Sequence, residues 1–162
     1  MILDTCHSVH EVSYVYRHRF GSIPIDSAGE RPSIVTGARL GAVVMPQRLG
    51  WSVRNRLRGR GKASVPVITH PRHRRWVFLV HRNREVVRQP TARRLAAGDV
   101  VILDPGCRVW LPMSDSRISW YWASAPEVSR VASELDAPTC SRVLTVAKAL
   151  IEERARMRPH GG

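Results

Sequence analysis

The stretch VITHPRHRRWVFLV, residues 67–80, decides the fold, because it sets two apolar runs on either side of a short polar segment. Two such runs around a Pro-containing loop are typical of a β-hairpin, so we predict strands over residues 65–69 and 76–80 and a loop over residues 71–75. The second run is apolar on both faces, which predicts a central strand. The arginines of HPRHRR are therefore expected at the exposed loop tip.

The residues before this hairpin predict a strand followed by a helix. LGAVVM, residues 40–45, is a short apolar run, and Pro46 suits the first turn of a helix that ends near Gly59 and Gly61. The expected buried stripe of that helix recurs every four residues and consists of Leu49, Val53 and Leu57.

The residues after the hairpin predict a loop over residues 81–94, then more strands, then helices. Apolar runs flank the turn Asp104-Pro105-Gly106 and predict a second hairpin. Residues 117–123 (RISWYWA) alternate as in a strand, with Ile118, Trp120 and Trp122 expected toward the core. Residues 126–136 and 139–157 repeat apolar side chains at helical spacing. The predicted fold is α+β: a small, mostly antiparallel sheet built from two hairpins, with flanking helices.

The length of 162 residues favours one folded domain. We expect residues 1–39 to form an N-terminal arm that is poorly ordered or an added strand, residues 40–136 a basic α+β domain, and residues 137–162 a C-terminal helix and tail. No apolar run approaches the ~20 residues of a membrane-spanning helix, and the start lacks the pattern of a secretory signal. Three widely spaced cysteines predict reduced thiols. We therefore expect a cytoplasmic protein.

The net charge of +13 is concentrated in the middle third of the chain. Residues 41–94 hold fourteen Lys and Arg against Glu85 alone, whereas the segments on either side are balanced. Basic clusters commonly neutralise nucleic-acid phosphates, because each contact releases a counterion. A merely solvated basic face is the alternative interpretation. The strong preference for Arg over Lys follows from GC-rich coding, but the clustering does not.

We predict that two groups of residues contact nucleic acid or another polyanion. On the helix after Pro46, arginines surround a tryptophan on the face opposite the apolar stripe, as in a stacking platform for single strands. Alternatively, this tryptophan packs under the N-terminal arm or at a subunit contact. The second group is the hairpin tip, where guanidinium groups suit phosphates. The predicted residues are Arg48, Trp51, Arg54, Arg58, Arg72, Arg74 and Arg75.

Catalytic motifs are not found. There is no D-x-D pair to hold two metals for nucleotidyl transfer, and no G-x-S-x-G, P-loop or Rossmann glycine pattern. Cys6, His7 and His10 offer a metal three ligands without an identified fourth. We therefore predict no catalytic residue, no metal and no cofactor, and we lean toward a protein that is not an enzyme.

The segment from about Leu40 to Leu135 resembles small, uncharacterised actinobacterial proteins related to primase-polymerases. The resemblance is carried by LGAVVMPQRLG, VITHPRHRRWVFLV and GCRVWLPMSDSRISWYWASAP. It implies a role in nucleic-acid metabolism, but no residue here matches the catalytic acids of that family, so it does not imply catalysis.

Two other classes of function also fit the sequence. LAAGDVVILDPGCRVWLP, residues 95–112, is similar to the turn of cupin barrels, which would imply a small-molecule or metal-binding barrel. The usual metal histidines are absent near Gly106. A protein-interaction module with an acidic partner is the third possibility.

Overall fold

The computed structural model describes residues 3–27, 29–59, 64–83, 88–127 and 135–157. Within them the chain forms four helices and seven strands. In chain order these are α1 (Val9–Phe20), β1 (Ser33–Val35), β2 (Leu40–Pro46), α2 (Gln47–Arg58), β3 (Val67–His70), β4 (His73–His81), α3 (Gln89–Ala97), β5 (Val101–Ile102), β6 (Arg108–Trp110), β7 (Tyr121–Ser124) and α4 (Cys140–Met157). None of the helices in the described ranges is long and apolar enough to span a membrane.

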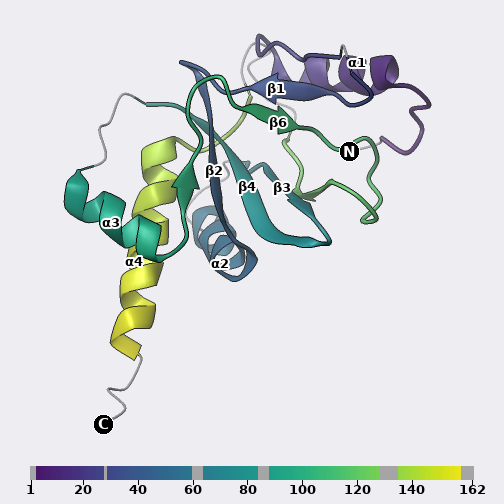
Figure 1. Ribbon diagram of the computed structural model, residues 1–162. Helices are drawn as coiled ribbons and strands as arrows, with labels where there is room; N and C mark the ends of the chain where they lie inside the picture. Colours follow the sequence, from purple (N-terminus) through teal and green to yellow (C-terminus); the bar gives the residue numbers. More distant parts are fainter. Residues whose placement is uncertain (1–2, 28, 60–63, 84–87, 128–134, 158–162) are drawn as a thin grey trace.

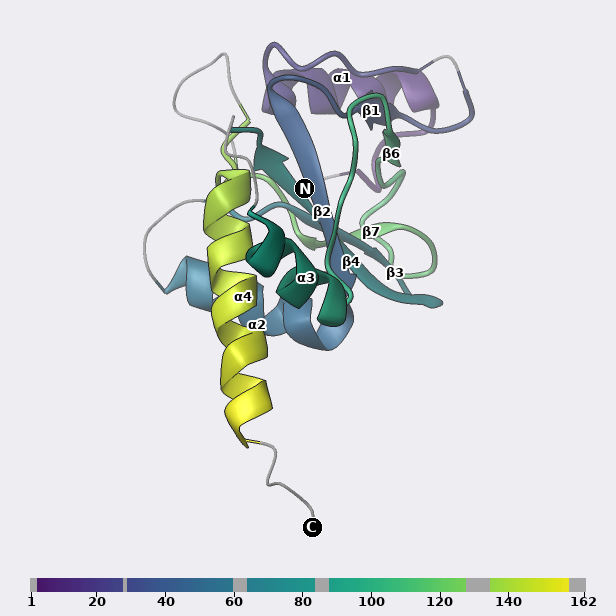
Figure 2. The same ribbon diagram turned by 60° about the vertical axis from the view of Figure 1, so that its left-hand side comes forward.

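The strands form a five-stranded sheet in the order β5-β2-β4-β3-β7 and a two-stranded sheet of β1 and β6. All these pairs are antiparallel. The predicted α+β class with a mostly antiparallel sheet is confirmed, and β4 is the middle strand, as expected. Figures 1 and 2 show α1, β1 and β6 on one side of the larger sheet, with α2, α3 and α4 on the other.

The first hairpin forms, but its loop is shorter than predicted. Strand β4 begins at His73, which pairs with His70 across a two-residue turn, after a shift of register between Thr69 and His70. Arg74 and Arg75 therefore belong to the strand, and the loop over residues 71–75 was wrong. The pairing of His70 with His73 extends the pairing of β3 with β4 beyond the apolar residues of the two strands.

The second predicted hairpin is wrong, because the runs on either side of Pro105-Gly106 join different sheets. Strand β5 pairs with β2, whereas β6 pairs with β1. Thr36 explains the separation: its hydroxyl donates to Asp104 O at 2.5 Å and accepts from Cys107 N at 3.0 Å, while Gly106 N donates to the Thr36 carbonyl at 2.8 Å. The turn is thus bonded to a distant segment instead of to a partner strand.

The first 39 residues contain a helix where we expected a poorly ordered arm or an added strand. Helix α1 is capped by Ser8, whose Oγ accepts from Glu11 N at 3.2 Å, and the Glu11 carboxylate accepts from His7 N at 2.6 Å just before the cap. Strand β1 follows, so an added strand is also present. The buried residues of α1 recur at helical spacing. The glycine and proline residues later in the first 39 residues break that pattern, so the helix was not predicted.

Three further predictions fall on the second half of the chain. Residues 89–97 form α3 where we expected a loop, and Pro90 lies in its first turn, where it costs no hydrogen bond. Strand β7 begins only at Tyr121, and Ile118 is 88% exposed instead of facing the core. The predicted helix over residues 126–136 lies mostly outside the described residues.

The helical stripes on α2 and α4 are confirmed, and they cover one face of the sheet. Both helices pack in one core with Met45, Trp76 and Phe78. Gly50 lets α2 approach β4 closely, because a Cβ there would lie 3.0 Å from Trp76. The buried stripe residues are Leu49, Val53, Leu57, Val143, Val146, Ala147 and Leu150.

Candidate polyanion-binding surface

The β3–β4 turn projects from the side of the sheet away from α4 in both views (Figures 1 and 2). Arg72 lies in the turn and Arg74 one residue into β4, and both side chains are exposed. Neither forms a salt bridge with any residue that the structure describes. These two guanidinium groups are therefore held on a hairpin base with their charges available to an outside anion.

Arg75, the third predicted arginine of the hairpin, already has an anionic partner. Its Nη1 lies 2.6 Å from Asp99 Oδ2, and its Nη2 donates to the Asp99 carbonyl at 3.0 Å. Asp99 adopts a positive φ of 56° between α3 and β5, which presents both oxygens to one side. The two contacts tie the start of β4 to the residue before β5 and compensate the Arg75 charge.

On α2, as on the hairpin, some of the predicted residues are exposed, whereas one makes contacts within the protein. Trp51 is 56% exposed, and Arg48 and Arg58 are exposed with it. Helix α1 lies on the opposite face of the sheet, so the N-terminal segment does not cover Trp51. That part of the packing interpretation is wrong, whereas a stacking role and a subunit contact both stay predictions.

Arg54 turns inward, away from the expected platform. Its guanidinium carbon lies 5.1 Å from the centre of the Trp76 ring, and its Nη1 donates to the Ala123 carbonyl at 3.0 Å. Burial lowers the pKa of Arg54, and the charge of Arg58 lowers it further. Arg54 thus links α2 to β4 and β7, because its side chain packs on Trp76 instead of beside Trp51.

The structure brings only part of the predicted set together. Pro46 pairs with Arg75 across β2 and β4, so the start of α2, with Arg48, lies beside the base of the hairpin. Arg58 ends the helix ten residues further along, roughly 15 Å away at 1.5 Å per residue. The α2 face and the hairpin turn are therefore neighbouring basic regions, and Arg58 belongs to a separate end of the molecule.

Three rings at the base of the turn escaped the sequence analysis. The ring of His73 stacks on Trp120, with centroids 5.7 Å apart and an interplanar angle of 22°. His70 lies edge-on to Trp120 at 5.2 Å and 4.7 Å from His73. A two-residue turn in HPRH would have predicted the histidine pair, but the approach of Trp120 from 47 residues away carries no local signal.

The surroundings of His70 affect its protonation. Desolvation, together with the charges of His73, Arg72 and Arg31, holds the pKa of His70 below its usual range. Its Nδ1 accepts a hydrogen bond from Arg72 N at 3.1 Å, which a neutral ring allows. A neutral His70 leaves the positive charge of the turn on the arginines.

Two alternative chemistries, a metal site at the N-terminus and a cupin-like turn, find no support in the geometry. No group of three His, Cys, Asp or Glu within the described ranges could hold a metal, which includes Cys6, His7 and His10. The strands within residues 95–112 do not pair with each other, as a cupin-like turn would require.

Comparison with known proteins identifies no relative. No family model, no curated protein and no solved structure matches this chain. The resemblance to primase-polymerase-related proteins therefore stays a prediction.

Proposed function

We propose that this chain is a nucleic-acid-binding domain that contacts single strands through the β3–β4 turn. Arg72 and Arg74 meet backbone phosphates, while a base stacks beside the ring pair of His73 and Trp120. The proposal assigns binding and no reaction. The observation that carries it is the combination, at one projecting turn, of a stacked ring pair with exposed guanidinium groups that form no salt bridge to the described residues.

The chemistry of single-stranded nucleic acid suits this arrangement. A basic surface follows the phosphates, and planar rings accept any base, because every base has a π-face. The surplus of charge in residues 41–94 adds long-range attraction that does not depend on sequence. Arg48 and the exposed Trp51 lie beside the hairpin base and extend the basic region along α2.

Fluorescence anisotropy with labelled single-stranded and duplex oligonucleotides over a salt series tests this proposal. We expect binding at low salt that weakens as salt increases, and tighter binding of single strands than of duplex. Absence of binding at low salt would contradict the proposal and leave an acidic protein as the partner to look for.

A charge-matched pair of double variants separates a local contact from bulk charge. In Arg72→Ser with Arg74→Ser, the log-log salt slope on single strands should decrease by about 1.4, or about 0.7 for each lost phosphate contact. Arg93→Ser with Arg156→Ser removes the same charge from exposed positions on α3 and α4. Equal losses in the two double variants would mean that the turn is only a solvated basic face.

Replacing the ring tests the stacking step. Trp120→Leu keeps an apolar side chain but removes the aromatic face, so single-strand affinity should decrease by about 1–3 kcal/mol. Duplex affinity should change little, since its bases are already stacked. A uniform loss on both substrates, with an unchanged melting temperature, would contradict a stacked base at Trp120.

A further inference from the structure

A pocket of about 500 Å³ lies between α3, α4 and the edge formed by β2 and β5, away from the β3–β4 turn. Its volume is within the range of sites for small molecules, roughly 300–1,000 Å³. Gly41 of β2 forms part of its lining. The lining residues come from four separate elements and the segments beside them, so no sequence motif marked them as a site.

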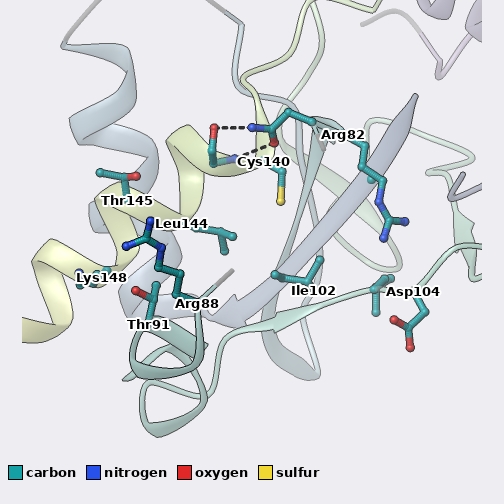
Figure 3. A pocket seen from close by; sticks show the side chains of 13 residues that line it. Arg82, Arg88, Thr91, Ile102, Asp104, Cys140, Leu144, Thr145 and Lys148 are labelled. Carbon is teal, nitrogen blue, oxygen red and sulfur yellow. Dashed lines mark hydrogen bonds between the residues drawn. The ribbon is translucent and has the colours of Figure 1, made fainter. Parts of the chain in front are cut away.

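One end of the pocket is cationic and rich in hydroxyl groups. Arg88 and Lys148 reach it from the start of α3 and from α4, and Thr91 and Thr145 lie beside them (Figure 3). Neither cation forms a salt bridge with a residue in the described part of the chain. Two uncompensated charges and two hydroxyl donors match the several oxygens of one phosphate group better than the two oxygens of a carboxylate.

The middle and the far end have a different character. Ile102 and Leu144 line the centre, and Arg82 and Asp104 lie at the other end (Figure 3). The Nη1 of Arg82 is buried without a hydrogen-bond partner among the described residues. This end of the pocket therefore combines a basic and an acidic side chain, unlike the cationic end.

Two hydrogen bonds between Asn83 and Ser141 hold one wall of the pocket in place. Asn83 Nδ2 donates to Ser141 Oγ at 2.8 Å, and Ser141 N donates to Asn83 Oδ1 at 3.3 Å. This pair fixes the start of α4 against the segment that follows β4.

We propose that this pocket binds a small phosphate monoester. The phosphate meets Arg88 and Lys148, and the organic body lies against Ile102 and Leu144. This site is distinct from the β3–β4 turn and goes beyond the proposed nucleic-acid binding.

Isothermal titration calorimetry on the full chain tests the site with three probes: phenyl phosphate, inorganic phosphate and phenol. Phenyl phosphate should bind at least about tenfold more tightly than either of its halves, because only it fills the cationic end and the apolar centre together. No binding of phenyl phosphate, or equal affinity for inorganic phosphate, would overturn the proposal.

Variants locate the site. Arg88→Gln and Lys148→Gln should each weaken phenyl phosphate binding by about tenfold or more. Arg93→Gln removes the same charge from an exposed position of α3 outside the pocket and should leave affinity within about twofold. A similar loss in all three variants would mean that net charge, and not the pocket, attracts the probe. The Arg72→Ser, Arg74→Ser protein should bind phenyl phosphate normally, so failure of this site and failure of the nucleic-acid surface are distinguishable.

Discussion

On one face of the five-stranded sheet, α2 and α4 press apolar stripes onto β4, whereas α1 and the β1–β6 pair cover the other face through contacts between distant segments. The helical stripes of the first layer are aliphatic, and they pack on Trp76 and Phe78 of β4, so we call it the aliphatic layer. The second also holds many aliphatic side chains, but its helix contributes Tyr16 and Phe20, which lie near Trp122, so we call it the aromatic layer. Tyr16 of α1 donates to the Pro112 carbonyl at 2.7 Å and accepts from Trp122 Nε1 at 2.9 Å.

The two layers depend on the sequence in different ways, one through local spacing and the other through contacts between distant segments. A stripe at helical spacing needs only its own helix and an apolar strand opposite. The aromatic layer needs Tyr16, Phe20 and Trp122, whose rings lie 5.5–6.2 Å apart, to arrive from opposite ends of the chain. It also places the N-terminal residues in the core, with Leu3 and Ile34 fully buried.

The largest expected effect tests whether the aromatic layer is as essential as the aliphatic one. Phe20→Ala empties a fully buried site and should lower the free energy of unfolding by about 3–5 kcal/mol, as should Phe78→Ala on the opposite face. Tyr14→Ala, on the same helix but 61% exposed, should cost within about 0.5 kcal/mol. Denaturant unfolding checks all three. A Phe20→Ala protein as stable as the Tyr14 variant would mean that α1 is an accessory segment.

The second prediction concerns the hydrogen-bonded hydroxyl of the aromatic layer. Tyr16→Phe leaves Trp122 Nε1 and the Pro112 carbonyl without this partner, which should cost about 1–3 kcal/mol at neutral pH. Double-mutant analysis with Trp122→Phe should show that the two losses are not additive, because the groups share one hydrogen bond.

The same hydroxyl should also make stability depend on pH. Burial raises the pKa of Tyr16 far above its ordinary value of 10.0, so the folded protein keeps the phenol neutral. The unfolded chain ionises near pH 10, and the stability present below that pH is lost as pH rises further. Between pH 10 and 11.5 the free energy of unfolding of the parent protein should decrease more steeply than that of Tyr16→Phe, by up to about 1.4 kcal/mol per pH unit. If the free energy of unfolding of the two proteins changed in parallel with pH, the burial of a neutral Tyr16 phenol would be contradicted.

A smaller effect tests the close packing of the aliphatic layer. Gly50→Ala favours the helix by about 1 kcal/mol, but its Cβ would lie 3.0 Å from the buried Trp76, and overpacking costs about 1–3 kcal/mol. We expect a net loss of about 1 kcal/mol in thermal or chemical unfolding. Gly59→Ala is the control: its nearest contact is 3.6 Å and its φ is −69°, so it should stabilise slightly. If both substitutions changed the free energy of unfolding in the same direction, the close approach of α2 to β4 would be contradicted.

The smallest effect on stability is expected outside both layers. Arg72→Ser and Arg74→Ser touch neither core, so each should change the free energy of unfolding by no more than about 0.5 kcal/mol. Arg54→Ser should cost more than either, because its guanidinium packs on Trp76 and bonds to Ala123. Thermal unfolding of the three single variants provides the comparison. Equal effects would remove the distinction between surface and inward-turned arginines.

The sequence by itself determined the α+β class, the central position of β4, the buried stripes of α2 and α4, and the location of the basic excess. Each of these follows from residues close together in the chain: the stripes from helical spacing, the central strand from a run that is apolar on both faces, and the basic excess from a count of charges. The hairpin around Pro71 was predictable for the same reason, although its turn length depended on the pairing of His70 with His73.

Only the tertiary structure decided which arginines remain available to a ligand, where β5 and β6 pair, and which side chains meet in the pocket. Arg75 is paired with the Asp99 carboxylate, 24 residues away, and Arg54 donates to the Ala123 carbonyl, 69 residues away. Strand β6 does not pair with β5, its expected partner, because Thr36 forms hydrogen bonds with the turn that precedes β6. Such contacts have no period along the chain, because each depends on a polar group that folding brings from a distant segment.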